Sequence, residues 1–502
     1  MRNTSCKNIR IAIKNYVNKA LNVKLIIPLH ADLCNDSSGG GGGQTIIILP
    51  HLCVPKVHAK NFALKISRNI IRRFCKIIAF RLSFHTYKKQ IVEWINSDEF
   101  RESYINKHHP YPPLLNPKTL DYKQIPAQLA WQLNIPLQED YRFIFLSLHG
   151  CGGHAMQTFF RQCDIAINTR FNTDKDDYMI LYDYLNSNDK HNYIAIWIRG
   201  YDFENDKFYH LLTKKVPILC VVRDPISLLK PFINHLGKNG YSGISPITLD
   251  MPYHEIILPP DYKFFQSSKD MSVAKLNEVL SYVDKREYFL AQKIHLLEKN
   301  IESFYYIPFK DIGIEHGFET FCALAEKFDF KPPKDKTPFQ TKLNGSNSCW
   351  LFPVCVICSR TPHIDLHIIL HTDMRLKDSH YKDITAMILD KEPTLDYKIA
   401  ILIKQDELQL LQNDNTLLQH ASNYIKGYMI YLQELEKREK ARHIKEDDML
   451  EYFKNNKEAC MYFQGILERE YAHLKEHRPD IIATWQYYNE FMKICEYHKE
   501  RK

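Results

Sequence analysis

Three polar segments in the middle of the chain carry residue types that bind anions or move protons. They are His149-Gly-Cys-Gly-Gly-His154, Arg199-Gly200 and Arg223-Asp-Pro225. Arginine binds a phosphate group through two parallel N–H donors, and histidine titrates near neutral pH. Glycine permits backbone turns that direct N–H groups at a phosphate. Together these residue types point to chemistry on an anionic group.

Each polar segment ends a short apolar run, at 142–148, 193–198 and 216–222. Helix-like stretches follow the first and third segments, at 155–163 and 228–236. Continuous apolar runs that end in turn residues and alternate with helices are typical of buried parallel strands. The pattern therefore predicts an α/β core. In such sheets ligands bind beyond the carboxyl ends of the strands, where all three segments are expected.

The glycine loop is the candidate phosphate-binding segment. Gly150, Cys151, Gly152 and Gly153 would present backbone N–H groups, and the following helix would direct its partial positive charge at the ligand. The loop matches neither G-x-x-x-x-G-K-[ST] nor G-x-G-x-x-G. A tight strand-to-helix turn without a ligand remains the alternative.

Two arginines are the candidate stabilisers of developing negative charge. Arg199 and Arg223 each follow a strand directly, so both guanidinium groups would reach the same edge of the sheet. Ser227 is a further candidate for phosphate binding. The alternative for the second segment is a surface Arg223 beside an Asp224 that only caps a helix.

Histidines of the glycine loop are the candidate general bases. His154 is the first choice and His149 the second, while His235 is a lesser candidate that fits a structural role better. A turn histidine that hydrogen-bonds only the backbone is the alternative for each.

The same segments carry a resemblance to a known family. Residues 143–154 resemble the first phosphosulfate-binding loop of the sulfotransferase family, and 218–227 resemble its second, 3′-phosphate-binding strand and turn. Residues 304–312, with the helix that runs to Phe328, are similar to the later strand, acidic turn and helix. The likeness covers about 190 residues, from 141 to 330. It implies a sulfotransferase-like, P-loop-type fold.

Within that fold the chain looks most like a bacterial family of unknown function. Its members are described as sugar transferases of surface-polysaccharide loci, and some are implicated as transferases of O-methyl phosphoramidate to capsule sugars. The resemblance implies a transferase that acts on glycans with a nucleotide-activated donor as cosubstrate and no tightly bound cofactor. The implied acceptor is a glycan or a lipid-linked polysaccharide.

The chain departs from the sulfotransferase pattern at three positions. The glycine loop lacks the Lys or Arg and the Ser/Thr pair that normally bind the donor phosphate. Pro231 stands where the second motif has its phosphate-binding Ser, eight residues after Arg223. Arg199 stands where many cytosolic members have a catalytic His. These departures favour a donor other than phosphoadenosine phosphosulfate.

Charge is distributed unevenly along the chain. The net charge is +8, but residues 1–90 carry 16 Lys/Arg against Asp32 and Asp36, so the other 412 residues sum to −6. Residues 65–81 place basic and apolar side chains at near-helical spacing, which is typical of a helix on an anionic membrane surface or of an ordinary basic helix. No nucleic-acid-binding motif accompanies the charge, so a nucleic-acid partner is not expected.

The sequence contains no recognisable targeting signal. Neither a run long enough to span a bilayer nor a secretory signal is recognisable. The expected location is the cytoplasm, and the basic segment would allow peripheral attachment at the inner face of the cell membrane.

Composition shifts divide the chain into four expected regions. They are a flexible basic segment with a five-glycine joint, a basic helical region with a proline-rich linker, the sulfotransferase-like core, and a mostly helical C-terminal region. Their boundaries are 1–60, 61–135, 136–345 and 346–502.

A cluster of cysteines and histidines lies in the C-terminal region. Cys355 and Cys358, with Cys349 before them and three histidines up to His371 after them, have residue types that bind zinc. However, 354–358 is apolar and 363–371 alternates apolar with mostly polar residues, which favours a pair of strands. No metal site is therefore expected.

The leading hypothesis is a transferase that moves an anionic group, O-methyl phosphoramidate or sulfate, from a nucleotide to a sugar hydroxyl. A glycosyltransferase that uses a nucleotide sugar is the second hypothesis. A third is a glycan- or membrane-associated scaffold with a degenerate, non-catalytic fold.

Overall fold

The computed structural model describes most of the chain after residue 85. The described residues are 86–168, 173–187, 193–199, 206–236, 242–258, 262–263, 273–286, 290–340, 347–360, 364–372, 380–391, 393–395 and 397–500. The five-glycine joint and the basic helix expected at 65–81 lie outside these residues. The chain divides into two compact units. Unit 1 contains 1–137, 174–187 and 210–213, and unit 2 contains the rest.

Among its described residues, unit 1 contains helices and turns but no strand. Its helices are α3 (Lys88–Asn96), α4 (Asp98–Phe100), the π-helical turn η1 (Arg101–Ile105), the 3-10 turn η2 (Tyr122–Gln124), α5 (Ala127–Gln132) and α7 (Asp174–Asn186). The proline-rich segment, which we expected to be a linker, packs within this unit. Trp94 donates its indole N–H to the carbonyl of Pro113, and Asn134 donates to the carbonyl of Pro112. The carbonyl of a proline still accepts a hydrogen bond, so a proline-rich segment can dock without forming strands.

Unit 2 is built on a five-stranded sheet in which every pairing is parallel. Its strands, in spatial order, are β2 (Ala166–Ile167), β3 (Ile194–Arg199), β1 (Phe143–Ser147), β4 (Val216–Val222) and β6 (Ile301–Pro308). The predicted runs at 142–148, 193–198 and 216–222 are therefore confirmed as strands. The α/β prediction is confirmed with them, whereas the two-residue β2 was not foreseen.

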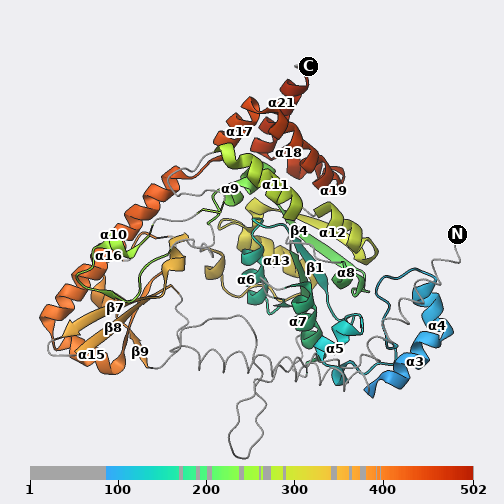
Figure 1. Ribbon diagram of the computed structural model, residues 1–502, viewed down its shortest axis with the longest axis horizontal. Coiled ribbons are helices and arrows are strands. Elements are labelled where there is room, and N and C mark those ends of the chain that lie inside the picture. Colours follow the sequence, from blue (N-terminus) through green and yellow to red (C-terminus); the bar gives the residue numbers. More distant parts are fainter. Residues whose placement is uncertain are drawn as a thin grey trace, which may run out of the picture. The chain divides into compact units, whose positions relative to one another are not determined.

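Helices cover both faces of this sheet, which explains the continuous apolar strands (Figure 1). α6 (Gly153–Gln162) and α13 (Gly317–Phe328) share one face, because Phe143 of β1 contacts Phe160 and Phe328. Adjacent residues of β6 point to opposite faces. Tyr305 contacts Phe328 of α13, whereas Tyr306 contacts His473 of α19 (Ala472–His477).

The remaining helices near this sheet also come from distant parts of the chain. They are α8 (Lys207–His210), α9 (Pro225–Ile233), α11 (Leu276–Arg286), α12 (Leu290–Leu297), α17 (Glu446–Asn455), α18 (Lys457–Glu470), α20 (Pro479–Ala483) and α21 (Gln486–Glu500). α12 is followed by the 3-10 turn η4 (Glu298–Asn300). α9 packs against α11, α17 and α21.

Unit 2 also contains a second, mixed sheet. Its spatial order is β5 (Ile247–Thr248), β7 (Val354–Arg360), β8 (Ile364–His371), β10 (Ala400–Lys404) and β9 (Tyr381–Asp383). β7 and β8 pair antiparallel, with Val354 opposite Leu370, so the predicted strand pair is confirmed. Three short helices and one long helix accompany this sheet, namely α10 (Tyr253–Ile256), α14 (Thr385–Ile388), α15 (Gln405–Gln412) and α16 (Asn415–Arg442).

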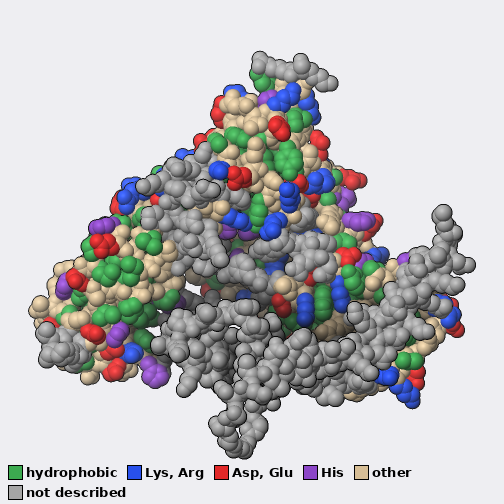
Figure 2. All heavy atoms as spheres, viewed as in Figure 1, with side chains coloured by type: hydrophobic (Ala, Val, Ile, Leu, Met, Phe, Trp, Pro, Cys, Tyr) green, Lys and Arg blue, Asp and Glu red, His purple; other side chains and the backbone are tan. Residues whose placement is uncertain are grey.

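The C-terminal region is helical from α15 onward, as predicted, although β7 to β10 precede those helices. No helix in the described part of the chain is both long and apolar enough to cross a membrane. On the face shown in Figure 2, basic and acidic side chains are interspersed. This mixture agrees with the net charge of −6 outside residues 1–90.

Candidate functional site

The glycine loop lies between β1 and α6 and has a backbone conformation that favours glycine. Gly150 and Gly152 have φ values of +84° and +72°, which residues with a side chain rarely adopt. A Cβ atom on Gly152 would lie 2.6 Å from Cδ1 of Ile312, so the loop also has no room for another residue there. These two glycines turn the chain directly into the first turn of α6.

Cys151 fills the space below the loop. Its side chain is completely buried, and burial raises the pKa of its thiol to about 12, although the nearby Arg223 opposes that rise. A neutral thiol is a poor nucleophile, so Cys151 acts as an apolar filler. Its backbone N–H donates to the carbonyl of Leu148 at 3.2 Å, so only the other N–H groups of the loop are candidates for a ligand.

Arg223 meets the glycine loop. Its Nη1 donates to the carbonyl oxygen of Gly150 at 3.2 Å, and its guanidinium carbon lies 4.5 Å from the centre of the Phe309 ring. The arginine is half-buried, and its planar group stacks on an aromatic ring as arginines commonly do. Since one of five N–H donors is used by Gly150, others remain to bind an anion.

The strand order explains why these two segments meet. From β1 the chain runs to β2 on one side of the sheet, and from β4 it runs to β6 on the other. β1 and β4 are neighbours, with Ser147 opposite Val221. Connections that leave adjacent parallel strands in opposite directions open a crevice between them at the carboxyl edge. The glycine loop and Arg223 border that crevice.

Arg199 and His154 both lie near the ring of one tryptophan, Trp197. The Arg199 guanidinium carbon is 5.3 Å from the ring centre of Trp197, and the His154 ring is 6.4 Å from the same tryptophan in an edge-to-face arrangement. Arg199 ends β3 opposite Ser147 of β1. The structure therefore brings the first-choice base and one of the two predicted arginines to the same edge of the sheet.

His149 lies on another side of the loop. Its ring centre is 5.2 Å from that of Phe232 and 6.2 Å from that of His235, both near the end of α9. The two histidines of the loop therefore have different neighbours: α9 for His149 and β3 for His154. His235, the lesser candidate, pairs with His149.

A buried polar network supports this edge and was not foreseen. The side-chain amide of Asn168 both accepts from the N–H of Trp197 at 2.7 Å and donates to its carbonyl at 2.9 Å. The indole N–H of Trp197 donates to Oγ of Ser147 at 2.7 Å, and Gln157 donates to the carbonyl of Asn168 at 2.8 Å. Asn168 thus continues the β2–β3 ladder with a side chain. The only sequence signal is a polar residue directly after an apolar one, which is too common to be diagnostic.

Asp224 caps two helices. Its Oδ1 accepts the N–H of Ile226 at 3.0 Å at the start of α9, which confirms the helix-cap alternative. Its Oδ2 accepts the N–H groups of Tyr487 and Tyr488, at 3.0 and 3.1 Å, in the first turn of α21. Burial raises the pKa of Asp224 although these N–H groups oppose the rise. Asp224 is therefore a structural residue.

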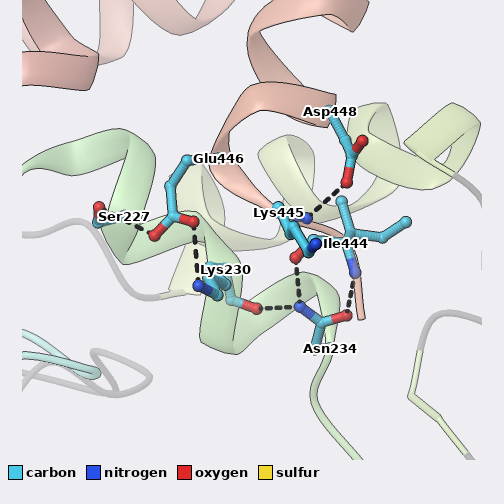
Figure 3. A network of polar contacts seen from close by, with 7 residues as sticks. All are labelled: Ser227, Lys230, Asn234, Ile444, Lys445, Glu446 and Asp448. Atoms are coloured by element: carbon cyan, nitrogen blue, oxygen red, sulfur yellow. Dashed lines mark hydrogen bonds and ion pairs between the residues drawn. The ribbon is translucent and has the colours of Figure 1, made fainter. Parts of the chain in front are cut away.

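Ser227 faces a carboxylate from α17 (Figure 3). Its hydroxyl donates to Oε1 of Glu446 at 3.2 Å, and Lys230 donates to Oε2 at 3.0 Å. One turn later, Asn234 exchanges two hydrogen bonds with the backbone of Ile444, at 2.9 and 3.0 Å. Phosphate binding by Ser227 remains a prediction. It would require Glu446 to move, because its carboxylate and a phosphate bound to the same hydroxyl would repel each other.

Lys293 is a cation at this edge that the sequence reading missed. It is 1% exposed and lies on the buried face of α12. Its ammonium group donates to the carbonyl oxygen of Arg199. The signal was present, because Lys293 occupies a position on the apolar stripe between Leu290 and Leu297.

The edge therefore gathers positive charge. Arg199, Arg223 and Lys293 come from three different elements, and the N-terminus of α6 adds backbone N–H groups. No cluster of three or more His, Cys, Asp or Glu side chains that suits a metal ion occurs among the described residues. The arrangement is suited to hold a phosphate or a similar anion beside a histidine.

Comparison with known proteins gives one match. Residues 306–497 match a family described as a protein of unknown function (DUF2972). No curated protein and no solved structure matches the chain. The matched segment begins in β6 and ends in α21, so it contains Glu446, Tyr487 and Tyr488 but not the glycine loop or Arg223. The chain thus carries, at residues 306–497, a DUF2972 domain of unknown function.

Proposed function

We propose that this chain is a group transferase with a sulfotransferase-like fold. It binds a nucleotide-activated donor at the carboxyl edge of the parallel sheet and moves an anionic group, O-methyl phosphoramidate or sulfate, to a sugar hydroxyl of a surface polysaccharide. The acceptor is a glycan or a lipid-linked polysaccharide, and the reaction takes place on the cytoplasmic side of the membrane.

One observation carries this proposal: the contact between Arg223 and the glycine loop at the crevice between β1 and β4. Two positive-φ glycines, a helix N-terminus and a half-buried arginine converge at the point of an α/β sheet where ligands bind most often. Each feature alone is common. Their convergence supports an anion site better than a plain turn does.

The reaction assigns a role to each group at the edge. The oxygen of the acceptor hydroxyl bonds to the phosphorus or sulfur of the transferred group, while the bond from that atom to the bridging oxygen of the nucleotide breaks. His154 takes the hydroxyl proton, and the nucleotide leaves with the electron pair as a phosphate. Arg199 and Arg223 stabilise the negative charge that develops on the transferred group and on the leaving phosphate.

The test is a calorimetric and thermal-shift panel. The ligands are cytidine di- and triphosphate, adenosine 3′,5′-bisphosphate, uridine diphosphate and its sugars, and pyrophosphate. We expect one nucleotide class to bind to the wild type and to lose roughly 30- to 100-fold in affinity in Arg223→Ala, because a charge-assisted hydrogen-bonded pair is lost. The matched control is Arg142→Ala, since Arg142 is exposed and directly precedes β1 at the opposite edge of the sheet.

The panel also separates the alternatives. A cytidine or adenosine nucleotide that requires Arg223 supports transfer of a small anionic group. A uridine diphosphate sugar with the same requirement would favour the nucleotide-sugar glycosyltransferase. Absence of any ligand would contradict the transferase and leave the scaffold hypothesis.

A further inference from the structure

Lys293 is buried on a helix that otherwise buries apolar residues. In α12 the fully buried side chains are Leu290, Lys293 and Leu297, which lie on one face at helical spacing. Lysine is rarely buried, because transfer of its charge from water is costly. A leucine or methionine at this position would serve packing better, so packing alone does not account for a lysine.

The ammonium group lies at the carboxyl edge of the parallel sheet. It donates to the carbonyl of Arg199, the last residue of β3. Burial raises the pKa of the Cys220 thiol in β4, and Lys293 opposes that rise, so the positive charge reaches the middle of the sheet. Lys293 thus lies close to both β3 and β4.

The glycine loop itself contains neither lysine nor arginine. Arg199 and Arg223 come from the strand ends on either side of β1, and both are half-buried. A charge in the protein interior is screened less than one in water, so a buried lysine contributes more to the local potential than an exposed one does.

We propose that Lys293 is a positioning residue that fixes the end of β3 and supplies a buried positive charge which selects multiply charged phosphate ligands. This inference rests on the proposed anion site and deepens it. The ligand class it implies is a nucleoside diphosphate or another donor with at least two negative charges near the loop, in preference to a monophosphate.

The test exploits the dependence on ligand charge. Calorimetry would measure the affinities of the wild type and Lys293→Met for pyrophosphate and for three ligands that share the base which binds best in the panel above. These three ligands are the nucleoside diphosphate, the nucleoside monophosphate and the uncharged nucleoside. We expect Lys293→Met to lose roughly tenfold in affinity for each unit of ligand charge and to bind the nucleoside unchanged. The matched control is Lys285→Met, which removes the same charge from an exposed position in α11.

Stability provides the second measurement. Lys293→Met removes the hydrogen bond to the carbonyl of Arg199, so it is expected to unfold at a lower denaturant concentration than the wild type. A lysine with a purely structural role would give the same loss of stability but an equal loss of affinity for every ligand, including the uncharged nucleoside. That outcome would overturn the inference.

The two proposals fail in different ways. If the wild type binds none of the phosphates, the proposed function is wrong and the inference falls with it. If the wild type binds and Lys293→Met binds equally well, only the inference is overturned. A loss that is the same for Lys293→Met and Lys285→Met would also overturn it, because it would reflect net charge alone.

Discussion

The parallel sheet and the mixed sheet each have five strands, but they differ in where they place the polar residues that follow their strands. In the parallel sheet every strand ends at the same edge, so Arg199, Arg223 and the glycine loop come together although they are distant in sequence. In the mixed sheet most neighbouring strands run in opposite directions. Residues that follow its strands are therefore divided between two edges.

Two cysteines of the mixed sheet are divided between its two faces. Cys355 and Cys358 are three residues apart on β7, so strand alternation places them on opposite faces. Cys358 is buried in the core of this sheet, whereas Cys355 is half-buried. His367 of β8 contacts Glu407 of α15. Cys355 and Cys358 thus face opposite sides of the mixed sheet.

The largest effect is expected in the core of the mixed sheet. Leu370 is fully buried and lies opposite Val354 and Ile401. Leu370→Ala should lower the free energy of unfolding by about 2–5 kcal/mol, through lost transfer energy and a residual cavity. Urea denaturation followed by circular dichroism measures it. Pyrophosphate affinity should remain that of the wild type, and a loss as large as that of Arg223→Ala would contradict the functional separation of the sheets.

The next effect is expected in the polar network of the parallel sheet. Asn168→Ala removes both hydrogen bonds to the backbone of Trp197 and should lower the free energy of unfolding by about 2–4 kcal/mol. The exposed Asn415 of α16 provides the matched control, since Asn415→Ala should stay within about 0.5 kcal/mol of the wild type. Unlike Leu370→Ala, Asn168→Ala should also weaken pyrophosphate binding. If binding persisted unchanged, the network would support the fold but not the site.

A pair of glycines gives a smaller effect. Gly152→Ala should lower the free energy of unfolding by about 1–3 kcal/mol, because of its positive φ and the contact with Ile312. Gly465 lies in α18 with no atom within 4 Å of a Cβ, so Gly465→Ala should stabilise the protein by up to about 1 kcal/mol. Thermal or urea unfolding would measure both. Equal effects of the two substitutions on the free energy of unfolding would show that position 152 does not require glycine.

The sequence predicted the parallel sheet well because its strands are continuous apolar runs, and those runs depend only on local composition. It also predicted that Arg223 and the glycine loop share an edge, since parallel strands impose that geometry. It did not predict the contact of Ser227 with Glu446, which are 219 residues apart. Periodicity shows which face of a helix is buried but not which helix covers it. For the same reason, the sequence did not reveal the carboxylate that the Ser227 hydroxyl faces.

The smallest effect tests that carboxylate, which belongs to the DUF2972 domain, against pH. Burial opposes ionisation of Glu446, but hydrogen bonds from Lys230 and Ser227 outweigh it and lower its pKa below the usual 4.5. Because the pKa of Glu446 is lower in the folded state than in the unfolded state, its ionised carboxylate stabilises the fold at pH values above 4.5. This stabilisation is lost as the pH falls through the folded-state pKa. At pH 7 Glu446→Gln should therefore unfold with about 1 kcal/mol less free energy than the wild type, and this deficit should shrink below pH 4.5. Glu451→Gln, exposed on the same helix, should show no such pH dependence. A deficit that stays constant from pH 7 to the acid range would mean that shape, not charge, joins α17 to α9.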